Sequence, residues 1–163
     1  MIPKNEVNLS NTKQLERALS DMLKNSHFKK KGTSWYLDGT DCTGVLNLQK
    51  SSWGGQYYIN LGVSAKALQA SPFPKESQCD IRVRLTELVE NKDLLVKSLD
   101  LENQTLDPAT RIKTLENGIK TVALAFLTET QSFQGIRELV AQRKLKTFMM
   151  NLKIKKLLGL PEE

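Results

Sequence analysis

The chain has 163 residues, of which 39% are hydrophobic and 26% charged, and its formal net charge is +6. This size and composition predict one soluble domain, residues 1–163, and no apolar run reaches the roughly 20 residues of a membrane-spanning helix. The first residues, MIPKNEVNLSNTKQ, contain no apolar segment typical of a secretory signal, so we expect a cytoplasmic protein.

An amphipathic helix is predicted to begin near Asn11 and to end at Asn25 or Ser26. Asn11 and Gln14 have the spacing of a capping box. The apolar side chains that follow recur at helical spacing and share one face: Leu15, Ala18, Leu19, Met22 and Leu23.

A run of strands is predicted next. The candidate segments are SWYLD (34–38), VLNLQKSSW (45–53), QYYINLGVS (56–64), CDIRVRLTEL (79–88) and the edge strand LLVKSLDL (94–101). Gly54 and Gly55 can form a two-residue hairpin loop, because both tolerate positive φ. That loop pairs Trp53 with Gln56, and further along it pairs Gln49 with Asn60.

The predicted hairpin separates apolar from polar side chains. One face carries Leu46, Leu48, Tyr57, Ile59, Leu61 and Val63. The other face carries Asn47, Gln49, Ser51, Trp53, Tyr58 and Asn60, to which the next strand adds Arg82 and Arg84. A slip of one residue would mix the two sets, which supports the assignment of faces.

The rest of the chain is predicted to be helical. Asp107 is a candidate N-cap with Pro108 at the first helical position, and a further helix is expected from about Phe133 to Leu158. Residues 143–163 form its basic C-terminal part and a short tail. The order of elements indicates an α+β fold, an antiparallel sheet of about four to five strands with the N-terminal and C-terminal helices mainly on one face.

The polar face of the sheet is the first candidate site. Antiparallel sheets commonly expose one polar face to solvent, so this face is either a solvated surface or a recognition surface. Two arginines beside amides and a tyrosine suit an anionic or peptide-like partner, because a guanidinium pairs with carboxylate or phosphate. Trp53 at the hairpin tip either packs on a neighbouring loop, which we favour, or is an exposed anchor.

Two basic stretches are the other candidates. The first is the run Lys29, Lys30 and Lys31, which is typical of a solvated loop or a protected edge strand but can also contact phosphate. The second consists of Arg143, Lys144, Lys146, Lys153, Lys155 and Lys156, with no acidic residue among them. This stretch fits a helix that packs on the core and leaves its basic side in solvent. It also fits a helix whose basic side binds acidic lipid, nucleic acid or an acidic protein.

Catalytic and cofactor signals are weak. The sequence has one histidine, His27, and two distant cysteines, Cys42 and Cys79, so no zinc-site pattern is present and no cofactor or metal is expected. No phosphate-binding glycine loop, dinucleotide fingerprint or nucleophile elbow occurs. The sequence therefore favours a non-catalytic protein.

Three stretches together resemble a known family: FKKKGTSWY (28–36), LQKSSWGGQYYINLGV (48–63) and CDIRVRLTEL (79–88). In this order they are similar to the bacterial domain-of-unknown-function family numbered 4304, and TVALAFLTETQSFQGIREL (121–139) looks like its helical second half. The resemblance implies a bacterial, stand-alone cytoplasmic domain over nearly the whole chain. It implies no activity and no catalytic residues.

We therefore expect a binding domain that holds a protein or a small anionic ligand on its polar sheet face. Neutralisation of a toxin is one version of this function. The alternative is nucleic-acid binding through the basic C-terminal helix and the run Lys29–Lys31.

Overall fold

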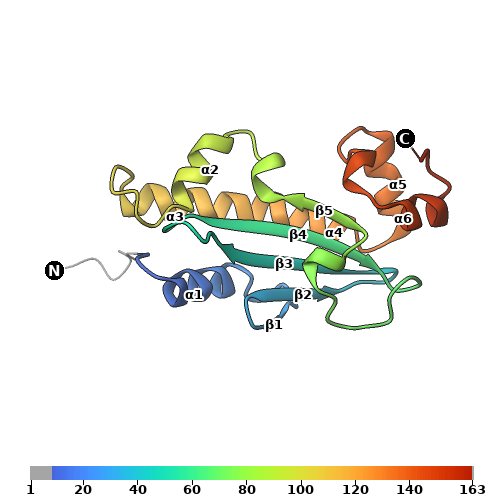
Figure 1. Cartoon of the computed structure of the whole chain (residues 1–163), viewed down its shortest axis with the longest axis horizontal. Coiled ribbons are helices and arrows are strands. Elements are labelled where there is room, and N and C mark those ends of the chain that lie inside the picture. Colours follow the sequence, from blue (N-terminus) through green and yellow to red (C-terminus); the bar gives the residue numbers. More distant parts are fainter. Residues whose placement is uncertain (1–8, 163) are drawn as a thin grey trace.

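The computed structural model describes residues 9–162, and residues 1–8 and 163 lie outside the described part. Figure 1 shows an antiparallel sheet flanked by helices, with its strands in sequence order across the sheet. The strands are β1 (Lys29–Lys31), β2 (Ser34–Asp38), β3 (Cys42–Lys50), β4 (Tyr57–Ala65) and β5 (Ile81–Arg84). The predicted α+β class and the number of strands are confirmed.

Six α-helices belong to the described part: α1 (Thr12–Met22), α2 (Lys92–Ser98), α3 (Pro108–Glu116), α4 (Leu124–Glu129), α5 (Phe133–Ala141) and α6 (Leu152–Leu158). Short 3-10 turns are η1 (Glu76–Gln78), η2 (Leu85–Glu87) and η4 (Thr147–Met149). No helix in residues 9–162 has the length and apolar character needed to cross a bilayer.

The main core lies between one face of the sheet and the helices. Leu46, Leu61 and Ile81 of the sheet are buried in one cluster with Leu15 of α1 and Ile119. Figure 1 shows α3 and α4 running behind the sheet as one rod, joined by the π-helical segment η3 (Asn117–Ala123). The π turn was not predicted, because an apolar stripe at the ordinary α-helical period does not indicate where a helix widens locally.

The first helix begins as predicted and ends earlier. The Asn11 side chain accepts a hydrogen bond from the backbone N–H of Gln14 at 3.0 Å. The helix stops at Met22, not at Asn25 or Ser26. Asn25 and His27 have φ angles of 69° and 67°, which take the chain out of the helix and toward β1.

The predicted hairpin register is wrong by two residues. Leu46 pairs with Leu61 and Asn47 with Asn60, and the backbone N–H of Ser51 donates to Gln56, so the loop contains residues 52–55. Only Gly54 has a positive φ, 106°, whereas the predicted two-residue loop needs it at both glycines. A two-residue shift moves Trp53 into the loop but keeps every side chain that stays in the two strands on its predicted face, so the apolar pattern did not reveal the error.

The predicted edge strand over residues 94–101 is also wrong, because most of it forms α2. Asn91 caps that helix by accepting a hydrogen bond from the N–H of Leu94 at 3.1 Å, and Leu95 is buried. The cap and the packing of α2 on α3 override the strand preference of this short apolar run. The strand-like pairing described for residues 94–101 is one isolated β-bridge, between Gln56 and Asp100.

The single helix predicted from Phe133 to Leu158 is instead two short helices. After α5, Arg143 adopts a φ of 60°, and Lys146 and Met150 are extended. Asn151 then caps α6, accepting a hydrogen bond from the N–H of Ile154. This break lets both Leu145 and Met150 reach the core, which one straight helix would not allow.

Candidate functional site

The polar face of the sheet gathers six of the eight residues predicted for it. In the observed register, Asn47 lies opposite Asn60, Gln49 opposite Tyr58, and Asn60 opposite Arg84. Arg82 lies opposite Gly62 on the same face. Side chains directly opposite one another in antiparallel strands project to the same side, so these residues share one surface.

A chain of side-chain hydrogen bonds crosses this face from β2 to β4. The Asn60 amide donates to Asn47 Oδ1 at 3.2 Å and to Gln49 Oε1 at 2.9 Å. The Asn47 amide in turn donates to Ser34 Oγ at 3.0 Å. Asn60 is buried, and satisfied networks of this kind hold their members in fixed orientations. The amides therefore form a rigid polar floor.

The segment that follows β4 folds back over part of the same face. Its Glu76 carboxylate accepts two hydrogen bonds from the Arg82 guanidinium, at 3.0 and 3.3 Å. The hydrogen bond that Arg82 donates to Glu76 raises the pKa of Arg82 above its ordinary value. Gly62 permits this approach, because a Cβ there would lie 2.7 Å from the Cys79 sulfur.

Arg84 makes a different contact. Its guanidinium lies over the ring of Tyr58, 4.0 Å from the ring centroid, which is a cation–π arrangement. Within residues 9–162, Arg84 takes part in no salt bridge. Its positive charge is therefore free to meet an incoming anion.

Part of this face forms an open hollow of about 460 Å³, which Tyr58 and Arg84 do not line. It is lined by Ser34, Tyr36, Asn47, Gln49, Asn60, Lys75, Glu76, Ser77 and Arg82. Five of these residues were not predicted from the sequence: Ser34, Tyr36, Lys75, Glu76 and Ser77. Alternation along SWYLD was a usable signal for Ser34 and Tyr36, whereas nothing local placed residues 75–77 over the sheet.

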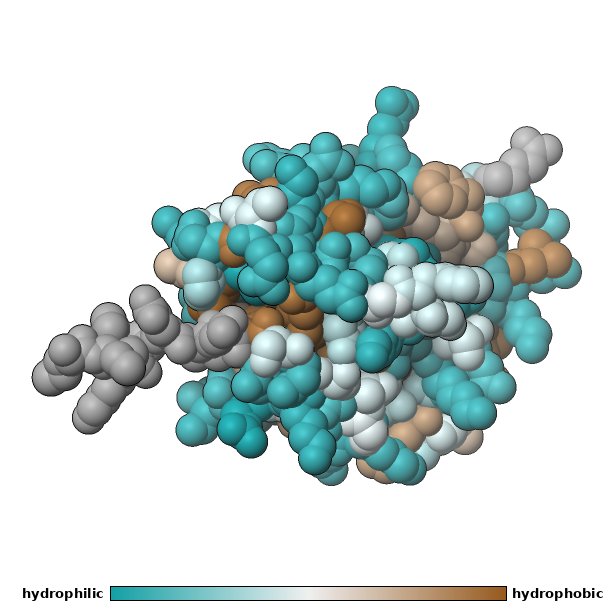
Figure 2. All heavy atoms as spheres, turned by 60° about the vertical axis from the view of Figure 1, so that its left-hand side comes forward, coloured by the Kyte–Doolittle hydropathy of each residue, from teal (hydrophilic) through white to brown (hydrophobic). Residues whose placement is uncertain are grey.

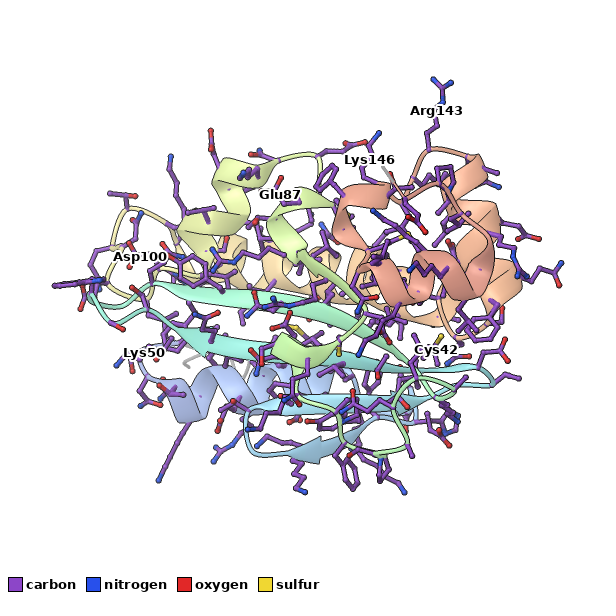
Figure 3. All side chains as sticks on the ribbon, turned by 45° about the vertical axis from the view of Figure 1, so that its right-hand side comes forward. Cys42, Lys50, Glu87, Asp100, Arg143 and Lys146 are labelled. Carbon is purple, nitrogen blue, oxygen red and sulfur yellow. The ribbon has the colours of Figure 1, made fainter. Side chains whose placement is uncertain are left out.

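Ser51 and Trp53 do not belong to this hollow. The Ser51 hydroxyl accepts a hydrogen bond from the N–H of Trp53 at 3.1 Å, and Ser51 lines a second hollow of about 340 Å³ with Lys50 and Glu102. Figure 3 shows Lys50 and Asp100 at this end of the sheet. Trp53 is 92% exposed, so the interpretation that it packs on a loop is wrong. Figure 2 shows a largely hydrophilic surface at this end, with apolar atoms in small patches.

The two basic stretches lie at opposite edges of the sheet. The run Lys29–Lys31 forms the exposed edge strand β1, whereas Met150 bridges Ile81 of β5 at the other edge. Lys155 does not join the C-terminal basic surface, because its side chain is buried and its ammonium donates to the Glu162 carbonyl at 3.4 Å. The other five predicted cations of residues 143–156 are exposed.

The two cysteines are buried and are not paired with each other. Burial raises the pKa of both thiols to about 12, with smaller contributions from Asp41 at Cys42 and from Glu76 at Cys79. Thiols with such pKa values are protonated at neutral pH and are poor nucleophiles. In the described part of the chain, no three His, Cys, Asp or Glu side chains form a group that could hold a metal ion.

Comparison with known proteins gives one match. No match was found among curated proteins or among solved structures. The family model described as Domain of unknown function (DUF4304) matches residues 19–129, which is more than half of the chain. That range contains the whole sheet, the polar hollow and the α3–α4 rod, and it ends before α5. The chain therefore belongs to the DUF4304 family.

Proposed function

We propose that this domain is a non-catalytic binding protein of the cytoplasm that holds an anionic group of its partner in the polar hollow. The observation that carries the proposal is the bidentate contact between Arg82 and Glu76 at the edge of the hollow. A guanidinium that accommodates one carboxylate in two hydrogen bonds has the geometry to accept another. The hydrogen-bonded amides of Asn47 and Asn60 form the floor of the hollow beside it.

The charges around the hollow support an anionic partner. Lys75 and Arg82 line it, and Glu76 is the one carboxylate in the lining. Arg84 is on the same face and carries no salt bridge within residues 9–162. The lining therefore has one more positive than negative charge, and Arg84 adds a further positive charge to the same face of the sheet, which favours carboxylates and phosphates.

The same lining supports binding over catalysis. General acid–base chemistry uses two groups whose environments separate their pKa values, and the only carboxylate here is engaged with Arg82. The nearby thiol of Cys79 has a pKa raised to about 12, so it offers no ready nucleophile at neutral pH.

The alternative of one nucleic-acid surface built from both basic stretches has less support. The run Lys29–Lys31 and residues 143–156 lie at opposite edges of the sheet, so one duplex groove or strand would have to pass around the sheet to reach both. Each stretch would have to bind by itself.

The proposal is tested by nuclear magnetic resonance titration of the isotope-labelled chain with the peptide Glu-Glu-Glu and with inorganic phosphate. We expect the side-chain signals of Arg82, Asn47 and Asn60 to shift together, and Arg82→Gln to abolish the shifts while leaving the thermal midpoint nearly unchanged. A matched control is Arg17→Gln, which removes an exposed charge from α1. Equal shifts at all surface cations, or none at the hollow, would contradict the proposal.

A further inference from the structure

The C-terminal segment carries apolar side chains that the core does not take up. Phe148 is 80% exposed, Leu152 48% and Leu157 40%. Single exposed leucines are ordinary on protein surfaces. Three large exposed apolar side chains within residues 148–157 instead indicate an interaction surface.

These apolar side chains lie among uncompensated cations. Arg143, Lys144, Lys146, Lys153 and Lys156 are exposed, and the sequence has no acidic residue between Glu138 and Glu162. None of the five makes a salt bridge within the part of the chain that the structure describes. Figure 3 shows Arg143 extending away from the ribbon at this end of the molecule.

The two kinds of side chain share the outer side of α6. At 100° per residue, Leu152, Lys156, Lys153 and Leu157 follow one another around an arc of about 140°. Ile154 and Leu158, on the opposite side of the helix, are buried. The outer arc is therefore mixed apolar and basic, with its leucines at the two borders.

This outer surface has a fixed orientation on the sheet. The backbone N–H of Asn151 donates to the Asp80 carbonyl at 2.8 Å, and its side-chain amide donates to the Asp80 carboxylate, also at 2.8 Å. Met150 is buried and bridges Ile81. The segment is thus fastened to β5 rather than loosely attached.

We propose that the C-terminal surface, made of the outer arc of α6 (Leu152, Lys153, Lys156 and Leu157) and of Phe148 in the turn before it, docks on a membrane surface rich in anionic lipids. Lipid headgroups supply negative charge to the cations, and the headgroup–acyl boundary takes up the phenyl ring and the leucines. A nucleic acid offers phosphates, and bases that stack on an aromatic ring such as that of Phe148, but no apolar phase for Leu152 and Leu157. The surface lies outside residues 19–129, so it is independent of the polar hollow and of the family match.

The test is co-sedimentation of the full chain with vesicles of phosphatidylcholine alone and with about one third phosphatidylserine. We expect binding only to the anionic vesicles. Lys153→Gln with Lys156→Gln should weaken it by about fivefold for each lysine. Phe148→Ser with Leu152→Ser should weaken it at least about tenfold, because less apolar area is buried. The control pair Lys13→Gln with Lys24→Gln removes two exposed charges elsewhere and should bind like the wild type.

Several outcomes would overturn the proposal. One is no sedimentation with anionic vesicles at about 50 mM salt, where electrostatic attraction is only weakly screened. Another is binding that the serine pair leaves unchanged, which would indicate charge attraction without apolar contact. Tight binding to random-sequence RNA in place of vesicles would assign the surface to nucleic acid. Circular dichroism of each variant verifies that the fold is intact.

Discussion

Arg82 donates from Nε and Nη2, one edge of its guanidinium, to the two carboxylate oxygens of Glu76 at 3.0 and 3.3 Å, although the two residues belong to a strand and to a loop turn. The Glu76 side chain is 10% exposed and that of Arg82 is 52% exposed. Glu76 is thus shielded from solvent, whereas Arg82 is accessible to it. An anionic partner that binds Arg82 would compete with Glu76 or share the guanidinium with it.

Replacing Glu76 with glutamine should therefore strengthen anion binding. The variant removes the internal negative charge and frees Arg82, and partly exposed ion pairs contribute at most about 1 kcal/mol, so we expect affinity for Glu-Glu-Glu to rise about two- to fivefold. Titration calorimetry measures the change. Glu87→Gln, which breaks the exposed 2.7 Å pair with Lys92, is the matched control and should leave affinity unaltered. Equal affinities for Glu76→Gln and wild type would show that the pair does not limit access to Arg82.

Arg111 should be important for stability, although no carboxylate pairs with it among the described residues. Its buried guanidinium donates to the carbonyls of Lys97, Ser98, Asp100 and Asn103, at 2.6–3.2 Å. Burial lowers its pKa below the ordinary value, with an opposing effect from Asp100. Arg111→Met would leave these carbonyls without donors. It should lower the free energy of unfolding, measured with urea, by about 3 kcal/mol. A loss below about 0.5 kcal/mol would contradict this role.

The two tryptophans should respond oppositely to truncation. Trp35 is 2% exposed and its indole N–H donates to Ser20 at 3.1 Å, so Trp35→Ala should destabilise the chain by about 3–5 kcal/mol. Trp53→Ala should change the free energy of unfolding by less than about 0.5 kcal/mol, because its ring is exposed at the hairpin tip. Thermal or urea unfolding of both variants provides the comparison, and a large loss for Trp53→Ala would contradict the exposed placement.

Thiol reactivity should report folding. Burial raises the pKa of Cys42 and Cys79 from 9.0 to about 12, so at pH 8 the folded chain should react slowly with Ellman's reagent and the unfolded chain quickly at both thiols. Because the folded pKa is the higher one, the stability gained from the neutral thiols is complete below pH 9 and is lost as pH rises toward 12. Rapid labelling of either cysteine in the folded chain would contradict their burial.

Much of the local structure was predictable because its signals are local. Asn11 and Asp107 cap α1 and α3 as the sequence indicated, since a cap depends on the few residues after it. Alternation along residues 46–63 assigned both faces of the hairpin correctly. The register failed by two residues, because a period of two cannot distinguish registers that differ by two.

The sequence by itself determined the α+β class, the faces of the central strands and the family. Only the tertiary structure decided that residues 75–77 lie over the polar face, that Glu76 meets Arg82, and that Trp53 is exposed. It also decided that the basic C-terminal segment breaks into two short helices fastened to Asp80. Caps and alternation act within a few residues, whereas these features depend on contacts between distant segments, whose positions the whole packed core selects.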